Sequence, residues 1–237
     1  MNYLCEANRT GPSKYVVRLR RVPIFVTLAA LLSFMVYGGT SEMSEKQSAE
    51  QPEVSAELLA ALAKWQVVRV PSRHHELLRK LVGEWDVTLR FHAGEQTWES
   101  ACRSQCTLLH RGRFMLEQIT GQVYAPDEKG SMRLEPFTAT RILGHDNYKK
   151  TFVGIFIDNQ NTALLTFLGI QKPGPSSEEI VMFGLIDEPM LDIHDTTMKY
   201  LLHLKDKDHY AWERYALAVS DDAKVIDFNY SRTNTKR

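Results

Sequence analysis

The chain has 237 residues, of which 43% are hydrophobic and 24% are charged, with 29 basic and 29 acidic side chains. This length and composition are those of a globular protein with one domain and extensions, and they exclude a chain that is disordered throughout. The first 38 residues hold five basic and one acidic side chain, so the remainder has 24 basic and 28 acidic ones, a net charge of −4 with histidine neutral. This balance provides no basic surface for nucleic acid, and we expect no nucleic-acid partner.

An apolar run, Val22 to Tyr37, follows a cluster of arginines in RLRRVPIFVTLAALLSFMVYGGTS. Basic residues before a short apolar run and small residues after it are typical of a secretory signal peptide. An uncleaved membrane anchor is the alternative, since the apolar stretch could extend to Ser41. The arginines would then stay cytoplasmic. Residues 1–39 therefore predict a signal peptide or anchor, and an extracytoplasmic domain that meets the membrane only through this segment.

The next two segments predict a linker and a helix. Residues 40–54 are rich in Ser, Glu and Gln and contain no aromatic residue, which indicates a flexible, solvated linker. SAELLAALAKW, Ser55 to Trp65, begins with a capping serine and has leucines at helical spacing. The stretch 55–70 therefore predicts a short amphipathic helix and a connector, and we expect the helix to pack on the domain.

A second short helix is predicted in PSRHHELLRKLVGEW, where Ser72 can cap the start and Gly83 ends the helix. His74 and His75 lie in its first turn, where neighbouring side chains point about 100° apart and cannot bind one metal ion together. We expect both histidines on a solvated face. From Trp85 onward the apolar period changes to two.

Ten short segments then read as strands, separated by turn-forming sequences such as HAGE, APDEKG, HDNY, DNQN, KPGPSS, KDKD and SDDAK. No helical pattern alternates with them, as a parallel sheet would require. Residues 71–233 therefore predict an all-β antiparallel meander, either a barrel or a sandwich. The strands are WDVTLRF, QTWESACRS, FMLEQITGQVY, FTATRILG, KKTFVGIFI, ALLTFLGI, EIVMFGLI, MKYLLHLK, AWERYALAV and VIDFNYSR.

Two of these strands differ in whether one of their faces is polar enough to meet solvent. MKYLLHLK alternates apolar and polar residues, which indicates one solvated face. TFVGIFI, residues 151–157, is apolar on both faces. We expect its outer face to be covered by an N-terminal helix or by a second chain, so a homodimer is possible.

The two ends of the strand region suggest how the sheet closes. Gly83 and Trp85 open the first strand, and Arg232 ends the last one. First and last strands are neighbours in a closed meander, so the guanidinium of Arg232 could lie on the indole of Trp85. A short helix, Gly-x-Trp and a terminal basic residue together resemble the calycin superfamily of lipocalin-like barrels. That resemblance implies an up-and-down barrel of about eight to ten strands.

Four blocks in order are similar to the bacterial domain-of-unknown-function family 1579. The similarity covers Pro71 to Arg232, and its most specific parts are the HDN turn with the following strand and the terminal Tyr-Ser-Arg. Members more often have tyrosine where this chain has His145, so no role is carried over to that position. The resemblance implies a calycin-like antiparallel barrel and supplies no established activity. The blocks are LRKLVGEWDV, GRFMLEQITG, ILGHDNYKKTFVGIFIDNQNT and VIDFNYSR.

Polar residues flank the strand that is apolar on both faces. His145, Asp146 and Asp158 raise the possibility of a metal or general-base site. A calcium loop does not fit, because Ala163 stands where the turn glycine belongs and Gly169 where a bidentate glutamate belongs. Asp and Asn side chains commonly bond to nearby backbone in turns, and we interpret these segments as turns. No serine lies in a nucleophile-elbow context, so we predict no catalytic residue, metal or cofactor.

Cys102 and Cys106 lie four residues apart on one predicted strand, with Cα atoms about 13 Å apart, too far for a disulfide unless the chain bends there. We interpret them as two half-buried thiols. A C-x3-C pair without a second cysteine or histidine pair is a weak metal signal.

Charged and hydroxyl side chains on apolar strand faces are the best candidates for a ligand site. Glu117 and Arg214 each stand between apolar residues at two-residue spacing. If they point into the barrel they need a partner, water or a ligand, and otherwise the charged faces turn outward. Tyr200, Tyr215 and His145 are lesser candidates.

The leading hypothesis is an extracytoplasmic binding protein, rather than an enzyme, that holds a small, mostly apolar molecule inside the barrel. One alternative is a hydrolase or isomerase that uses Glu117 or His145 as base at the barrel mouth. A second is a haem barrel resembling nitrobindin, with His203 or His209 as ligand, although the further glycines of that family are absent. A third is a structural or assembly role through the strand that is apolar on both faces.

Overall fold

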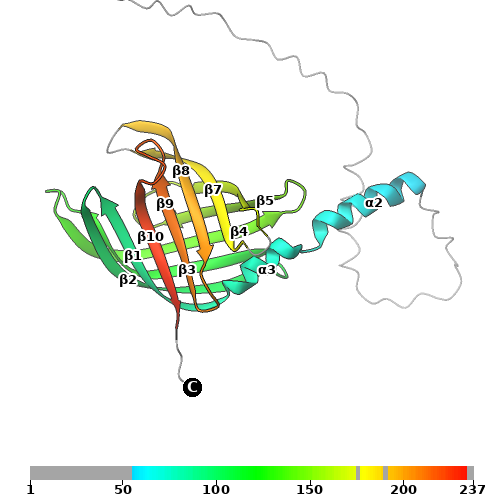
Figure 1. Ribbon diagram of the computed structural model, residues 1–237, viewed down its shortest axis with the longest axis horizontal. Coiled ribbons are helices and arrows are strands. Elements are labelled where there is room, and N and C mark those ends of the chain that lie inside the picture. Colours follow the sequence, from blue (N-terminus) through cyan, green and yellow to red (C-terminus); the bar gives the residue numbers. More distant parts are fainter. Residues whose placement is uncertain (1–54, 175–176, 189–191, 234–237) are drawn as a thin grey trace, which may run out of the picture. The chain divides into compact units, whose positions relative to one another are not determined.

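The computed structural model describes residues 55–174, 177–188 and 192–233, and the predictions for residues 1–54 lie outside them. Two helices, α2 (Ala56–Arg69) and α3 (Arg73–Lys80), precede ten strands (Figure 1). No helix in this part of the chain is long and apolar enough to cross a membrane. The strands are β1 Gly83–Ala93, β2 Gln96–Leu109, β3 Phe114–Pro126, β4 Met132–Asp146, β5 Thr151–Asp158, β6 Leu165–Gln171, β7 Glu179–Glu188, β8 Ile193–Leu204, β9 His209–Ala216 and β10 Lys224–Arg232.

The ten strands form a closed antiparallel barrel in which each strand pairs with its neighbours in chain order and β1 pairs with β10. The predicted all-β meander is confirmed, and closure excludes the sandwich alternative. Closure also leaves no unpaired sheet edge. The alternation predicted for β8 is confirmed as well, since Met198, Tyr200 and Leu202 are buried inside the barrel.

The first and last strands meet as the sequence predicts. Trp85 lies opposite Arg232, whose guanidinium carbon is 4.1 Å from the centre of the indole ring. The indole N–H donates to the Leu81 carbonyl at 2.8 Å, and Arg232 Nη1 donates to the Val82 carbonyl at 3.0 Å. Gly83 has φ +140°, and a Cβ there would lie 2.4 Å from Arg232 Nη1. Both the backbone conformation and the contact with Arg232 therefore favour glycine at this position.

Helix α3 packs against β3 and β4 at this end of the barrel. Its start is fixed at Ser72, whose N–H donates to His75 Nδ1 at 2.9 Å. Leu77, Leu78 and Leu81 are buried beneath it. The prediction that His75 lies on a solvated face is wrong, because the ring returns to cap the helix start and is only 3% exposed.

Helix α2 forms, but none of its residues is buried. Leu59 and Trp65 of the predicted apolar stripe are 55% and 46% exposed, so the expectation that this helix packs on the domain is wrong. Its C-terminal end is held by hydrogen bonds: Asn147 Nδ2 donates to the Val70 carbonyl at 2.7 Å, and Arg113 donates to the Arg69 carbonyl.

The C-terminal end of α2 borders the outer face of β5, because Val68 and Val153 line the same pocket. Val153 and Ile155 are half-buried, and Ile157 is 41% exposed. The exposed surface continues across β6 and β7, where Leu168 and Phe183 are paired neighbours. Cover by a second chain, the other alternative, stays a prediction.

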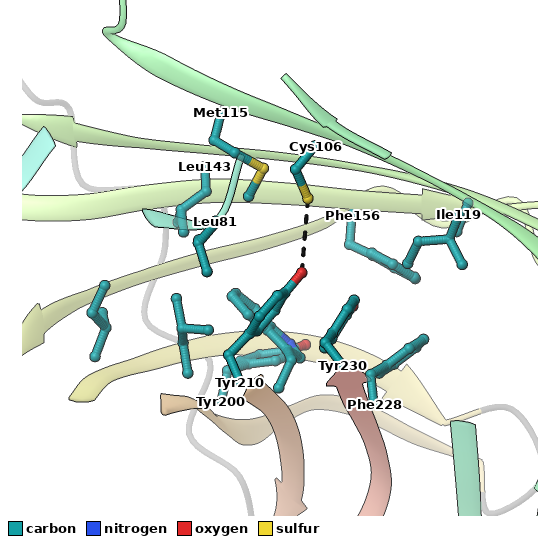
Figure 2. Packing of buried hydrophobic residues seen from close by; sticks show 14 of the residues in the cluster. Leu81, Cys106, Met115, Ile119, Leu143, Phe156, Tyr200, Tyr210, Phe228 and Tyr230 are labelled. Atoms are coloured by element: carbon teal, nitrogen blue, oxygen red, sulfur yellow. Dashed lines mark hydrogen bonds between the residues drawn. The ribbon is translucent and has the colours of Figure 1, made fainter. Parts of the chain in front are cut away.

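The barrel interior nearest α3 is filled by side chains. Met115, Leu143, Tyr210 and Tyr230 are all buried there, and the two tyrosine rings stack with centroids 3.9 Å apart (Figure 2). This packed half of the interior borders the part that contains a cavity.

Candidate functional site

A cavity of about 510 Å³ occupies the other half of the interior. Residues next to the β3–β4 and β5–β6 turns line its mouth, among them Ala125, Met132 and Gln160. Its walls are mostly aromatic and aliphatic and include Phe91, Phe137, Phe156, Leu165, Phe167 and Ile226. Small-molecule sites typically measure about 300–1,000 Å³ and are mostly apolar, and this cavity fits that description.

Arg141 forms part of the cavity wall although only 1% of it is exposed. Its guanidinium carbon lies 3.9 Å from the ring centre of Trp212, 5.2 Å from that of Phe156 and 5.5 Å from that of Phe228. These rings hold the guanidinium between them and leave it little freedom. The arginine is therefore a rigid part of the boundary between the cavity and the packed half.

Glu117 lies beneath Arg141 and is fully buried. Arg141 Nη1 donates to Glu117 Oε2 at 2.5 Å, and Ser104 Oγ donates to Glu117 Oε1 at 2.7 Å. Arg141 also donates to the Tyr230 hydroxyl at 3.2 Å. Burial by itself would lower the pKa of Arg141, but the adjacent Glu117 raises it above its normal value. The two residues thus form a buried ion pair whose charges balance each other.

Two buried thiols lie on β2. Cys106 Sγ is 3.7 Å from the Tyr210 hydroxyl, a contact that Figure 2 marks by its dashed line, and burial followed by Glu117 raises the thiol pKa to about 12. Cys102 donates to the Gln122 carbonyl at 3.3 Å, and burial raises its pKa too. Both cysteines are free, as expected, but they are buried rather than half-buried, with 6% of Cys102 and 1% of Cys106 exposed.

Arg214 and Tyr200 both face the cavity and are paired neighbours on β9 and β8. The Tyr200 ring is 3% exposed, and its hydroxyl has no hydrogen-bond partner within the described part of the chain. Burial raises the pKa of Tyr200, while the guanidiniums of Arg214 and Arg141 act in the opposite direction. Both cations are therefore close enough to act on the same hydroxyl.

The other candidates from the sequence lie elsewhere. Tyr215 is on the outer face of β9, where its hydroxyl donates to Glu213 Oε2 at 2.7 Å. His145 lies at the α3 end, with its ring stacked on His74 at 4.3 Å, and it borders a separate pocket of about 250 Å³. The structure thus brings Arg214 and Tyr200 together in the cavity, sets Glu117 below it, and keeps Tyr215 and His145 away from it.

The acidic residues around β5 are occupied by turn formation. Asp146 Oδ1 accepts from the N–H groups of Tyr148 and Lys149, and Asp158 Oδ1 accepts from those of Gln160 and Asn161. The described residues contain no group of three or more His, Cys, Asp or Glu side chains that could hold a metal ion. The hydrogen bonds of Asp146 and Asp158 to the backbone confirm the interpretation of both segments as turns.

Neither histidine considered for haem lines the cavity. His203 Nδ1 is 3.6 Å from Glu179, and His209 Nδ1 is 2.9 Å from Asp206. Both side chains are about half exposed. A haem inside the barrel would have to be held without them.

Arg141 is a cavity residue that sequence reasoning missed. A signal was present, because Arg141 stands between Ala139 and Leu143 at two-residue spacing, just as Glu117 stands between Met115 and Ile119. What the sequence lacked was the register that places Glu117 directly opposite Arg141 across β3 and β4.

Comparison with known proteins gives a family but no activity. A family model described as "Protein of unknown function (DUF1579)" matches residues 70–232. No curated protein matches the chain. One solved structure, a redesigned beta barrel, is 11% identical and covers 67% of this chain and 96% of its own, but with a TM-score of 0.31 it supports no argument. Because the family match includes both α3 and the whole barrel, the chain belongs to the DUF1579 family of proteins of unknown function.

Proposed function

We propose that the barrel binds a small, mostly apolar molecule in the cavity of about 510 Å³. The observation that carries the proposal is the contrast between the two halves of the interior. One half is filled by buried side chains, and the other has large apolar walls around open space. Apolar walls without a facing partner lose dispersion contacts, and a bound apolar molecule restores them.

The positions of the two candidate bases count against an enzyme at the barrel mouth. Both carboxylate oxygens of Glu117 are engaged by buried donors, from Ser104 and Arg141, and no part of the side chain is exposed. His145 lies at the opposite end, next to α3. A general base must reach the substrate proton directly or through one water, and neither residue is placed to do so in the cavity.

The proposal is tested by asking whether the cavity takes up apolar molecules. The purified full-length chain is examined by native mass spectrometry for retained molecules and titrated with an environment-sensitive apolar dye. Ala125→Trp, which places an indole on the inner face at the mouth, is expected to weaken dye binding about tenfold or more. Gln122→Trp, on the exposed outer face of the same strand, is the matched control and should bind as the wild type does.

A wild-type protein that retains no molecule and takes up none of a panel of apolar compounds would overturn this proposal. Equal dye binding by the wild type and Ala125→Trp would also do so, because the dye would then lie outside the cavity.

We further propose that the domain acts outside the cytoplasm. The support is the sequence of residues 1–39, in which arginines precede a short apolar run. Fusion of alkaline phosphatase after the complete chain provides the test, since that reporter is active only after export. An inactive but stably produced fusion would contradict the proposal.

A further inference from the structure

We propose that the ligand is an amphipathic monoanion with a carboxylate head group, bound head-first so that the carboxylate meets Arg214 and Tyr200 and the apolar body extends toward the mouth. This inference rests on the proposed function, because it specifies the molecule that the same cavity holds.

The polar residues of the cavity are arranged by depth. Arg141 and Tyr200 belong to its inner wall, because both are almost fully buried and both lie against aromatic rings. Arg214 adjoins them, since it is the strand neighbour of Tyr200 and lies two residues after Trp212, on which Arg141 stacks. The carboxylates among the cavity residues, Glu135 and Asp158, are near the β3–β4 and β5–β6 turns. The cavity therefore offers cations and a hydroxyl at its inner end and acidic groups at its mouth.

Two buried donors at the inner end have no acceptor. The Tyr200 hydroxyl and Arg141 Nε lack a hydrogen-bond partner within the described residues. A buried donor that has given up water without gaining a partner is unfavourable. An acceptor brought by a ligand would remove this penalty, and a charged acceptor forms the stronger hydrogen bond.

The donors at the inner end suit a carboxylate head group. Glu117 neutralises Arg141 through their hydrogen-bonded ion pair, so Arg141 contributes donors but little net charge to the cavity. Arg214 supplies a second guanidinium, and its five N–H donors allow it to keep its contacts within the protein while it binds a carboxylate. A carboxylate has two acceptor oxygens, which suits one hydroxyl donor and one guanidinium at this end of the cavity.

The apolar walls of the cavity indicate what the rest of the ligand, beyond its head group, is made of. Apart from the polar groups already named, the surface between the two ends is mainly phenyl and aliphatic, including Phe156, Phe167 and Leu165. Such walls reward an apolar body and penalise a second polar group placed halfway along the ligand. A fatty carboxylate has the required form, with one charged end and an uninterrupted apolar chain.

The test compares two probes that differ only in the head group. Dodecanoate and 1-dodecanol are titrated at pH 7.5 against the full-length wild-type chain, and binding is measured by displacement of the apolar dye. We expect the wild type to bind dodecanoate at least tenfold more tightly than dodecanol.

Three variants test which residues cause the preference for dodecanoate over dodecanol. Arg214→Gln should weaken dodecanoate binding about tenfold or more and change dodecanol binding by less than about threefold, because only the charged contact is lost. Tyr200→Phe should weaken both probes several-fold, since the hydroxyl donates to either oxygen. Lys199→Gln removes a cation on the outer face of β8, next to Tyr200 in sequence, and should leave both affinities unchanged.

The outcomes separate the two proposals. Equal binding of the acid and the alcohol by the wild type, or an acid preference that persists in Arg214→Gln, overturns the monoanion inference and leaves the cavity proposal standing. Binding of neither probe, nor of the dye, overturns the proposed function itself. If Arg214→Gln does not fold, Arg214→Lys is expected to keep the acid preference, and its loss with the charge retained would contradict the inference.

Discussion

At the scale of single residues, Glu117 and Arg141 form a buried ion pair in the barrel interior. Both side chains are almost entirely buried, and three further polar groups, from Ser104, Tyr230 and the neighbouring Cys106, lie around them. Removing one member of a buried ion pair leaves an unbalanced charge in a medium of low polarity. The stability of the barrel should therefore depend on the pair as a unit.

The first prediction tests this unit. Glu117→Gln or Arg141→Met alone should lower the free energy of unfolding by about 3–5 kcal/mol, because each leaves the other charge buried without a counter-charge. The double variant Glu117→Gln/Arg141→Met should be less destabilised than the sum of the two. Urea denaturation of the four proteins forms a double-mutant cycle, and Arg103→Met, an exposed arginine on β2, is the control. Additive effects would show that the pair makes no joint contribution.

The second prediction concerns pH. Burial lowers the pKa of both His75 and His145 below their unfolded value of 6.5. Neighbouring His74, Arg113 and Arg79 lower the pKa of His75 further, and Asn147 and Asp146 partly oppose the shift at His145. Protonation therefore favours the unfolded chain, so these histidines contribute stability above pH 6.5 that is lost as the pH falls below it.

The measurement is the free energy of unfolding from urea denaturation between pH 7.5 and 5. Stability should fall over this interval in the wild type, and the fall should be smaller in His145→Asn, which removes one titrating ring from the cluster. An unchanged pH dependence in His145→Asn would contradict the assignment to this cluster.

At the scale of elements, the strands follow their local sequence closely. All ten predicted strands form, and their turns use the predicted Asp, Asn and Gly residues; Asp127, for example, accepts from the N–H groups of Lys129 and Ser131. The helices show the limit of local reasoning. Both form where capping and spacing predict them, but α3 buries its leucines whereas α2 buries nothing.

The third prediction concerns the residue that joins α3 to β1. Gly83→Ala should lower the free energy of unfolding by about 1–3 kcal/mol, because alanine is strained at φ +140° and its Cβ would displace the Arg232 guanidinium. Gly94→Ala is a useful comparison, since a Cβ at that exposed turn meets no atom within 4 Å and carries only the backbone strain of φ +61°. Chemical denaturation should show a larger decrease in the free energy of unfolding for Gly83→Ala than for Gly94→Ala. Equal decreases would count against a specific role of the Arg232 contact.

The fourth prediction concerns α2. Replacing both Leu59 and Trp65 with serine should change the free energy of unfolding of the barrel by less than about 0.5 kcal/mol each, because both side chains are exposed. Leu78→Ala in α3, where the side chain is fully buried, should cost about 2–5 kcal/mol. If the variant with both α2 substitutions lost as much free energy of unfolding as Leu78→Ala, α2 would have to be packed in solution on a surface of the barrel or of another chain.

At the scale of the whole molecule, the barrel combines a packed half and an open half. The packed half, with α3 and the contact between Trp85 and Arg232, fixes the closure of the sheet. The open half can then keep an unfilled cavity, because its walls are held by strands that are already paired on both sides. The proposed ligand site and the contacts that close the sheet thus lie at different ends of the barrel.

The fifth prediction follows from that division. A molecule that binds the cavity of the folded barrel stabilises it by RT ln(1 + [L]/Kd), about 2.7 kcal/mol at a concentration one hundred times Kd. Dodecanoate should therefore raise the thermal midpoint of the wild type in a concentration-dependent way and leave that of Ala125→Trp nearly unchanged. Thermal denaturation followed by circular dichroism provides the measurement, and an equal shift in both proteins would place the binding outside the cavity.

The sequence alone determined the strands, their order, the inward-facing side of β8 and the contact that closes the barrel. These features follow from a two-residue apolar period, from turn chemistry and from the glycine, tryptophan and arginine at the two ends, all of which act locally or at the chain ends of the sheet. It also proposed Glu117, Arg214 and Tyr200 as unusual residues on apolar faces.

Only the tertiary structure decided what those residues do. The pairing of Glu117 with Arg141 depends on strand register, and the burial of His75 depends on how α3 meets the barrel end. The position of the cavity depends on the space left between side chains from strands far apart in the sequence, such as Phe91, Phe167 and Ile226. Side-chain period specifies which way a residue points, but not which residues it meets or how much room remains among them, and this room is where the ligand is proposed to bind.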